Sequence, residues 1–198
     1  MKLNVLLAIL LASFITHVNA AEDWSSVPKK KQTKLGLYMT PAQANAYMQE
    51  NAQKTLFLDV RTRAEVNFLG TPTVTDANIP YMKLNEWYAW NDKKGSFKME
   101  VNSAFEGEVE HRMQAKGLSK NDTVIVICRS GSRSSKAADL LASLGYTKVY
   151  SIVEGYEGDK AKDGAQKGQR VVNGWKNAGM PWSYNLAKEK MYLAEAEM

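Results

Sequence analysis

The stretch that decides the fold runs from Val124 to Ser135 and reads Val-Ile-Val-Ile-Cys-Arg-Ser-Gly-Ser-Arg-Ser-Ser. Its first four residues are β-branched and apolar, the pattern of a strand that is covered on both faces. After Ser134 the apolar residues recur at helical intervals, and Gly145 is a natural stop. The stretch therefore predicts a buried strand, a tight polar loop and a helix, with Cys128 at the carboxyl end of the strand.

Cys128 stands where open α/β sheets place their ligand crevice. The backbone N–H groups of the loop and the start of the helix favour negative charge, and Arg129 and Arg133 add to that field. Gly131 supplies the backbone freedom that so tight a loop needs. A buried structural cysteine is the alternative, but the polar run after Cys128 is a poor continuation of a core strand. We therefore predict a nucleophilic thiolate at Cys128.

The spacing between Cys128 and Arg133 narrows the chemistry. Cysteine phosphatases have a similar strand, loop and helix, but their loop is one residue longer and a histidine usually precedes the cysteine, where this chain has Ile127. A shorter loop makes a smaller cradle, better matched to one added sulfur atom than to a tetrahedral phosphate. The loop resembles the active loop of the rhodanese (sulfurtransferase) family, in which the cysteine holds sulfane sulfur as a persulfide and passes it to a nucleophile.

Two further segments carry this resemblance. One is the strand end Asp59-Val60-Arg61, which is followed by Glu65, and the other is the closing segment from Gly174 to Pro181. The resemblance implies that Asp59, Arg61 and Glu65 support the loop and tune its charge. A purely structural interpretation of Glu65 is also open, because Thr62 and Glu65 have the spacing of a helix capping box. Thr40 and Gln43 have the same spacing and predict the start of an earlier helix.

The resemblance implies an α/β fold, a three-layer rhodanese-like domain in which helices flank a mostly parallel five-stranded sheet. It also implies a sulfurtransferase (rhodanese) reaction. Cys128 would take sulfane sulfur from a small anionic donor such as thiosulfate and pass it to cyanide or to a thiol, which can belong to a protein. The residues expected to bind the substrate and the persulfide are Arg129, Ser130, Gly131, Ser132, Arg133 and Ser134.

Two other functions stay open. One is a sulfur carrier, or a module that binds a redox partner, without catalytic turnover. The other is an enzyme like a phosphatase or an arsenate reductase, against which the loop length argues. A histidine-based zinc site and a Cys–His protease are poorly supported, because His111 is the only histidine beyond residue 20. We expect neither a metal nor a cofactor.

The N-terminus has the features of a secretory signal peptide over residues 1–20. Lys2 precedes an apolar run, and Val18-Asn19-Ala20 resembles a cleavage site. The run is too short to span a membrane, so we expect a periplasmic protein that keeps no membrane anchor after cleavage. The rest divides into a flexible leader at 21–34, a rhodanese-like domain at 35–183 and a C-terminal helical tail at 184–198.

The net charge and the cysteine content limit the classes of partner that we expect. The net charge of +5 over 198 residues is mild, which suits steering of small anions. The sequence has no basic stripe with interleaved aromatic residues, so it gives no indication of nucleic-acid binding. Because Cys128 is the one cysteine, the chain has no resolving thiol, and any transferred sulfur must go to an outside acceptor.

Two segments carry weaker expectations. Residues 83–103 are expected to form a short helix, a turn at Gly95 and a connector. The run from Glu157 to Arg170, rich in Gly, Lys and Asp, is either a solvated loop or a border of the active-site mouth. In the second case its basic residues would influence the choice of substrate or partner: Lys160, Lys162, Lys167 or Arg170.

Overall fold

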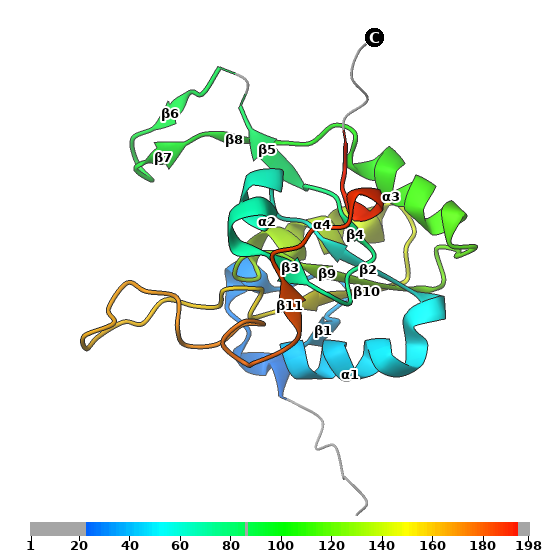
Figure 1. Ribbon diagram of the computed structural model, residues 1–198, viewed down its shortest axis with the longest axis horizontal. Coiled ribbons are helices and arrows are strands. Elements are labelled where there is room, and N and C mark those ends of the chain that lie inside the picture. The colour runs from blue at the N-terminus through cyan, green and yellow to red at the C-terminus, as the bar shows by residue number, and fades with distance from the viewer. Residues whose placement is uncertain (1–22, 86, 194–198) are drawn as a thin grey trace, which may run out of the picture.

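A parallel sheet of five strands forms the centre of the molecule (Figure 1). The computed structural model describes residues 23–85 and 87–193, so the signal peptide expected at 1–20 lies outside the described residues. In spatial order the strands are β1 (Tyr38–Met39), β10 (Lys148–Ile152), β9 (Thr123–Ile127), β2 (Thr55–Asp59) and β4 (Ala77–Asn78). All four pairings are parallel, which confirms the predicted fold class.

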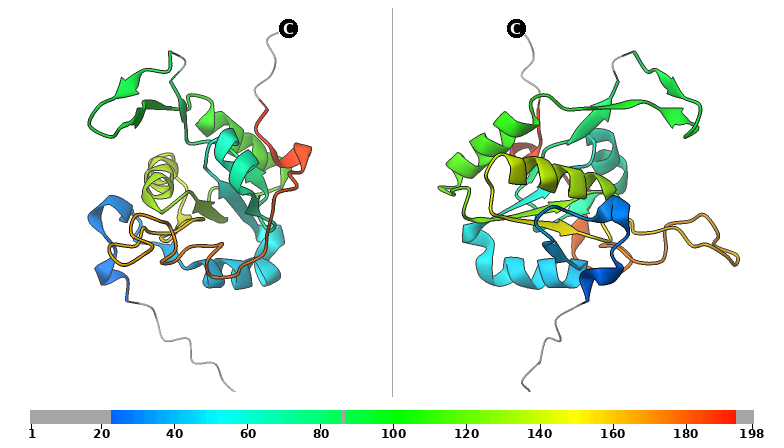
Figure 2. Two further views of the ribbon diagram at one scale, coloured as in Figure 1. Left: turned by 60° about the vertical axis from the view of Figure 1, so that its left-hand side comes forward. Right: turned by 180° about the vertical axis from the view of Figure 1, so that it is seen from behind.

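Helices cover both faces of the sheet, which gives the three layers seen in Figure 2. Alternate residues of a strand point to opposite faces. In β9, Val124 and Val126 join one apolar cluster and Ile125 and Ile127 join the other. The first cluster includes residues of α3 and α4, and the second includes residues of α1. The α-helices of the described residues are α1 (Pro41–Asn51), α2 (Arg63–Leu69), α3 (Phe105–Ala115) and α4 (Ser132–Ser143).

Two helices begin at the capping boxes that the sequence predicts. Before α1, the Thr40 hydroxyl accepts from the Gln43 N–H at 3.2 Å, and the Gln43 side chain accepts from the Thr40 N–H at 2.9 Å. Thr62 and Glu65 make the same reciprocal pair before α2. Each box satisfies two N–H groups that the first turn leaves without helical partners. The box at Thr62 also fixes Glu65 close to the end of β2.

The segment at 83–103 differs from its prediction. The part that the structure describes forms two antiparallel ribbons, β5 (Met82–Leu84) with β8 (Met99–Val101), and β6 (Trp90–Asn91) with β7 (Ser96–Phe97). The expected helix is wrong because a tight turn at Gly95, where φ is 57°, brings the two halves together. The rings of Trp90 and Phe97 then meet across the ribbon at 5.4 Å. The four strands β5 to β8, which we name the aromatic arm, project from the same side of the molecule as residues 157–170 (Figures 1 and 2).

The leader is packed where the sequence predicts a flexible segment. Two short 3-10 helices, η1 (Trp24–Ser26) and η2 (Lys29–Lys31), lie within it. The side chain of Lys31 is buried, and its Nζ bonds both carboxylate oxygens of Asp159 at 2.9 and 2.8 Å. The expectation of a flexible leader is therefore wrong at Lys31. The leader is joined to a segment that lies 128 residues further along the chain.

The described part of the tail, residues 184–193, is mostly irregular and contains no α-helix. It contains one 3-10 turn, η4 (Lys188–Lys190), after which Met191 pairs with Asn78 beside β4. Just before the tail, β11 (Trp182–Ser183) pairs with β3 (Thr71–Pro72). The tail is thus held by strand-like pairing along the edge of the sheet. Elsewhere in the chain, a further 3-10 turn, η3 (Ala52–Lys54), links α1 to β2.

Candidate active site

Cys128 lies at the carboxyl end of β9, at the bottom of a loop that leads into α4. Only 1% of Cys128 is exposed. Its Sγ accepts a hydrogen bond from the Gly131 N–H at 3.2 Å, and the thiol donates to Ser134 Oγ at 3.5 Å. Gly131 has a φ of 91°, which only glycine adopts readily. The loop therefore turns back and directs an N–H donor at the sulfur.

Several other N–H groups of the loop remain without a protein acceptor. Among the hydrogen bonds of the described residues, none uses the backbone N–H of Arg129, Ser130, Ser132 or Arg133. The last two belong to the first turn of α4, where N–H groups have no helical partner. The Gly131 N–H is already directed at Sγ. A loop of this kind can hold negative charge on an atom bound to Cys128.

The segment that follows β10 is hydrogen-bonded to the backbone of the loop and packs closely against it. The Cys128 carbonyl accepts from the Tyr156 N–H at 2.8 Å, and the Arg129 carbonyl accepts from the Glu157 N–H at 3.0 Å. Gly155 packs so closely that a Cβ there would lie 2.5 Å from the Ser130 nitrogen. Substitution of Gly155 would therefore displace the loop backbone.

Ser134 links the thiol to the neighbouring strand. Its hydroxyl donates to the Gly131 carbonyl at 3.0 Å and accepts from Ser151 Oγ on β10 at 2.9 Å. Ser134 and Ser151 are both fully buried. Sequence reasoning named Ser134 but missed Ser151. The signal for Ser151 was a serine between the large side chains of Tyr150 and Ile152 in β10, and it can be interpreted only once its buried partner is known.

Glu65 and Arg133 form a two-pronged ion pair at the edge of the loop. The guanidinium nitrogens of Arg133 lie 2.6 and 2.5 Å from the carboxylate oxygens of Glu65. Burial alone would raise the pKa of Glu65, but the hydrogen bonds and charge of Arg133, together with the bonds from Thr62, lower it to about 2. The pKa of Arg133 is raised, because Glu65 and the nearby Cys128 sulfur outweigh its burial. Glu65 is therefore both a helix cap and an ion-pair partner.

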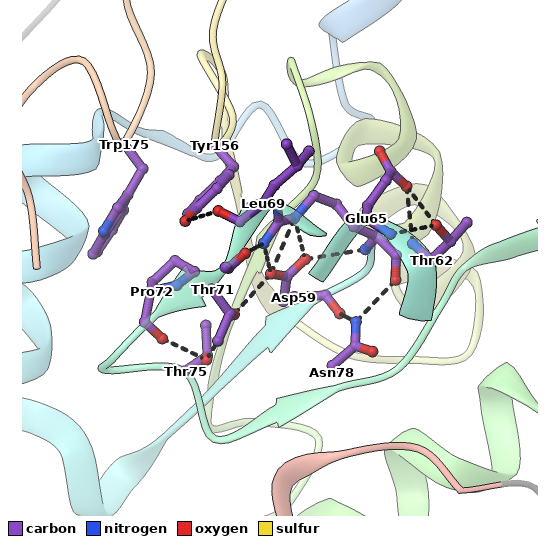
Figure 3. A network of polar contacts seen from close by, with 12 residues as sticks. Asp59, Thr62, Glu65, Leu69, Thr71, Pro72, Thr75, Asn78, Tyr156 and Trp175 are labelled. Carbon is purple, nitrogen blue, oxygen red and sulfur yellow. Dashed lines mark hydrogen bonds and ion pairs between the residues drawn. The ribbon is translucent and has the colours of Figure 1, made fainter. Parts of the chain in front are cut away.

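Asp59 and Arg61 form a second pair that is completely buried. Figure 3 shows the hydrogen-bond network around Asp59. Arg61 Nε lies 2.9 Å from one carboxylate oxygen of Asp59, and Nη2 lies 2.5 Å from the other. Thr71 also donates to Asp59 at 2.9 Å, and the Asn78 amide donates to the Asp59 carbonyl at 2.8 Å. The ring of Tyr156 lies 3.7 Å from the Arg61 guanidinium carbon. This network fixes the end of β2, whose Asp59 is the register partner of Ile127, the residue before Cys128.

The other arginines near the loop differ in position. The side chain of Arg129 is 47% exposed and pairs with Glu157 at 2.5 Å, at the surface. Arg170 donates to the Gly158 carbonyl at 2.5 Å. Burial and the charge of Arg129 lower the pKa of Arg170, whereas Glu157, Asp159 and the Cys128 sulfur oppose that shift. Arg133 and Arg170 therefore both interact electrostatically with the Cys128 sulfur.

Two cavities open on either side of the loop. The first, of about 780 Å³, includes Ser130 in its wall together with the leader and residues 159–172. The second, of about 440 Å³, includes Ser132 and Arg133 together with the aromatic arm. Lys160, Lys162 and Arg170 line the first cavity, whereas Lys167 does not. Residues 157–170 therefore border the mouth of the site.

Within residues 23–85 and 87–193, no group of three or more His, Cys, Asp or Glu side chains could hold a metal ion. Over the same ranges, no helix has the length and apolar character needed to cross a membrane.

Comparison with known proteins decides the family. The sequence profile of the rhodanese-like domain matches residues 40–162, which is more than half of the chain. The chain belongs to the rhodanese-like family. The matched range contains the Asp59–Arg61 pair, Glu65 and the whole loop from Cys128 to Arg133.

Individual relatives agree with this rhodanese-like assignment. Thiosulfate sulfurtransferase 18 of Arabidopsis thaliana is 33% identical over 115 residues, which cover 58% of this chain and 71% of the plant protein. An uncharacterised protein of Rickettsia rickettsii is 27% identical over 127 residues, or 64% of this chain and 81% of that protein. The crystal structure of Rv0390 from M. tuberculosis superimposes with a TM-score of 0.52 at 27% identity, covering 74% of this chain and 96% of that one. Thiosulfate sulfurtransferases are therefore among the relatives of this rhodanese-like chain.

Proposed function

We propose that this protein is an exported sulfurtransferase that carries sulfane sulfur as a persulfide on Cys128. The observation that supports it best is the position of Sγ. The sulfur faces the Gly131 N–H at 3.2 Å, inside a loop with several further N–H groups that have no protein acceptor. Such donors stabilise negative charge that appears during a reaction, without having to reorganise.

The first step loads Cys128. Its thiolate attacks the outer sulfur of thiosulfate, a new sulfur–sulfur bond forms, and the old one breaks. Sulfite leaves with the electron pair of the broken bond. The product is a Cys128 persulfide whose outer sulfur carries the negative charge, and the loop N–H groups and Arg133 stabilise it.

The second step unloads Cys128. A nucleophile such as cyanide or a thiolate attacks the outer sulfur of the persulfide, and the Cys128 thiolate leaves with the bonding pair. Cyanide is thereby converted to thiocyanate, and a thiol to a persulfide. Neither step needs an external oxidant or reductant. The reaction is of the ping-pong type, with the enzyme alternating between two covalent states.

Intact mass spectrometry tests the proposal directly. Purified protein lacking residues 1–20 is incubated with thiosulfate beside the Cys128→Ser variant. We expect the wild type alone to gain about 32 Da, one sulfur atom, and to lose it on addition of cyanide, as covalent catalysis requires. No adduct from thiosulfate or from any other sulfane donor would overturn the proposal. A stable adduct that no small acceptor removes would instead indicate a sulfur carrier that needs a protein partner.

Hydrolysis of p-nitrophenyl phosphate is the companion assay. We expect none above the Cys128→Ser background, because the loop is one residue shorter than a phosphatase loop. Phosphate release that depends on Cys128 and exceeds sulfur transfer would replace the proposed activity with a phosphatase. Export is tested separately, by asking whether the expressed full-length chain is recovered from the periplasm with Ala21 as its first residue.

A further inference from the structure

The aromatic arm, with the connections between its strands, gathers most of the exposed apolar side chains of the described residues. Eleven large hydrophobic residues are exposed in that part of the chain, and six of them lie between residues 84 and 101. These six are Leu84, Trp87, Tyr88, Trp90, Phe97 and Val101. Single exposed hydrophobic residues are normal on a protein surface, but a group of them in one place marks a surface that meets a partner or a membrane.

Trp87, in the connection between β5 and β6, is the most exposed of the six. It is 87% exposed, and no ring or cation–π contact of the described residues involves its indole. Its backbone is nevertheless fixed. The Trp87 N–H donates to Asn85 Oδ1 at 3.2 Å, and the Tyr88 N–H donates to the Asn85 carbonyl at 2.9 Å. The turn therefore holds the indole ring out in the solvent.

Three more rings of the arm form a cluster next to this turn. The Phe97 ring lies 5.4 Å from that of Trp90 and 6.2 Å from that of Tyr88. The three residues are still between 49% and 65% exposed. Contacts within the arm thus hold the ribbon together without covering its apolar surface.

The charge at the tip of the arm, residues 87–98, is positive. The tip contains one acidic residue, Asp92, and three lysines, Lys93, Lys94 and Lys98, which give a net charge of +2. Within residues 23–85 and 87–193, none of the three lysines forms an ion pair. The tip therefore combines exposed aromatic rings with cations that are free to meet an anionic partner.

This combination is typical of a surface that meets a lipid membrane. Trp and Tyr side chains gather at the boundary between lipid and water, where one end of the ring is in apolar surroundings and the other is hydrated. Lysines beside them are attracted to anionic headgroups. At the centre of a protein–protein interface, by contrast, lysine is depleted. The arm also projects clear of the central sheet and its helices, so its tip can reach a flat surface (Figures 1 and 2).

We infer that the tip of the aromatic arm binds the surface of an anionic lipid membrane. The rings of Trp87 and its neighbours enter the headgroup region, and the lysines contact the lipid phosphates. This contact is peripheral and needs no segment that spans the membrane. It goes beyond sulfur transfer, because it gives the protein a location rather than a substrate. Trp87 lines neither of the cavities beside the loop, so mutation can separate the two properties.

Binding to vesicles of defined composition tests the inference. The protein lacks residues 1–20, because their apolar run can bind lipid by itself. It is floated on a density gradient with vesicles of equal parts phosphatidylglycerol and phosphatidylcholine, or of phosphatidylcholine alone. We expect the wild type to bind the anionic vesicles. Binding to the neutral vesicles, or to the anionic ones in about 1 M salt, should be weaker by about fivefold or more, because the attraction to the headgroups is absent or screened.

Matched variants assign the binding to the arm. Trp87→Ser should lower the partition coefficient for anionic vesicles about tenfold, the loss expected when one large aromatic side chain is no longer buried. Phe68→Ser removes a ring on α2 that is 75% exposed and should bind like the wild type. Lys93→Gln should lower the partition coefficient about fivefold. Lys54→Gln, an exposed lysine of η3, is its control and should leave binding unchanged.

Several outcomes would overturn the inference. A wild type that does not bind anionic vesicles does so by itself, whatever the sulfur-transfer assays show. Equal losses in Trp87→Ser and Phe68→Ser, or in Lys93→Gln and Lys54→Gln, do so as well, because general hydrophobicity or total charge would then explain the binding. If the wild type does not bind and Trp87→Ser instead converts a dimer to a monomer in analytical ultracentrifugation, the arm is a contact between copies of this chain. Persulfide formation from thiosulfate should be the same in Trp87→Ser and the wild type, which shows that the variant is folded.

Discussion

The two carboxylate–arginine pairs at the carboxyl edge of the sheet have the same chemistry and opposite surroundings. The side chains of Asp59 and Arg61 are completely buried, whereas those of Glu65 and Arg133 are 20% and 15% exposed. The buried pair is enclosed by further hydrogen bonds and by the Tyr156 ring. The second pair borders the loop and a cavity. One pair is therefore part of the buried framework, whereas the other holds the Arg133 guanidinium at the wall of a cavity beside the loop.

Breaking the buried pair should have the largest effect on stability. Arg61→Met leaves the Asp59 carboxylate without its cation in an environment that water does not reach. We expect a loss of about 3–5 kcal/mol in the free energy of unfolding, measured by urea denaturation. The double variant Asp59→Asn/Arg61→Met should recover part of that loss, because no charge is then buried alone. If the single variant is as stable as the wild type, the network around Asp59 does not hold the end of β2.

The pair at the loop should make the stability of the fold depend on acid. Because the pKa of Glu65 lies at about 2 in the folded chain and its ordinary value is 4.5, Glu65 stabilises the fold fully above pH 4.5. This contribution is lost progressively as the pH falls from 4.5 to 2. Between pH 7 and pH 2 the wild type should therefore lose up to about 3 kcal/mol more than Glu65→Gln does.

Unfolding curves of both proteins across this pH range measure the difference between them. Other carboxylates titrate in both proteins, so their contributions cancel in the comparison. Parallel curves for the wild type and Glu65→Gln would contradict the role of the pair.

Arg133 should matter more for chemistry than for stability. Arg133→Lys keeps a positive charge but loses the two-pronged geometry that only a guanidinium provides. We expect the rate of persulfide formation from thiosulfate to fall about tenfold, with a stability loss of about 1 kcal/mol. Arg129→Lys should have a smaller effect, because the Arg129 side chain is half exposed and pairs with Glu157. Arg112→Lys, far from the loop, is the control for a general effect of replacing arginine.

Equal losses in Arg129→Lys and Arg133→Lys would contradict this difference between the two arginines. Their common effect would then come from total charge around the loop rather than from the geometry at Glu65.

The sequence predicted what is determined by neighbours along the chain. The capping boxes at Thr40 and Thr62 are complete within four residues, and the apolar run before Cys128 specifies a strand by itself. Both were therefore predicted correctly. Contacts between distant residues were not predictable. Lys31 is buried because Asp159, 128 residues away, satisfies its charge, and nothing near the lysine run indicates that partner.

The ion pair of Glu65 and the ribbon of the aromatic arm also depend on contacts that the neighbouring sequence does not reveal. The capping role of Glu65 was visible in four residues, but its bond to Arg133 spans 68 residues, and only the family resemblance indicated a role near the loop. In the arm, aromatic residues around a turn were compatible with a helix as well as with a ribbon. The contact of Trp90 with Phe97 decided for the ribbon, because cross-strand aromatic pairs stabilise antiparallel strands.

The smallest effect expected comes from the rim of the buried network. Tyr156→Phe keeps the ring over the Arg61 guanidinium and removes the hydroxyl that donates to the Leu69 carbonyl at 2.9 Å. Lys176 Nζ also reaches that carbonyl, at 3.4 Å, so the acceptor keeps a partner. We therefore expect a loss of about 1 kcal/mol or less, measured by urea denaturation, and unchanged persulfide formation. Tyr156→Leu should cost clearly more, because it also removes the ring. If Phe and Leu cost the same, the ring does not stabilise Arg61, and the buried pair depends on its hydrogen bonds alone.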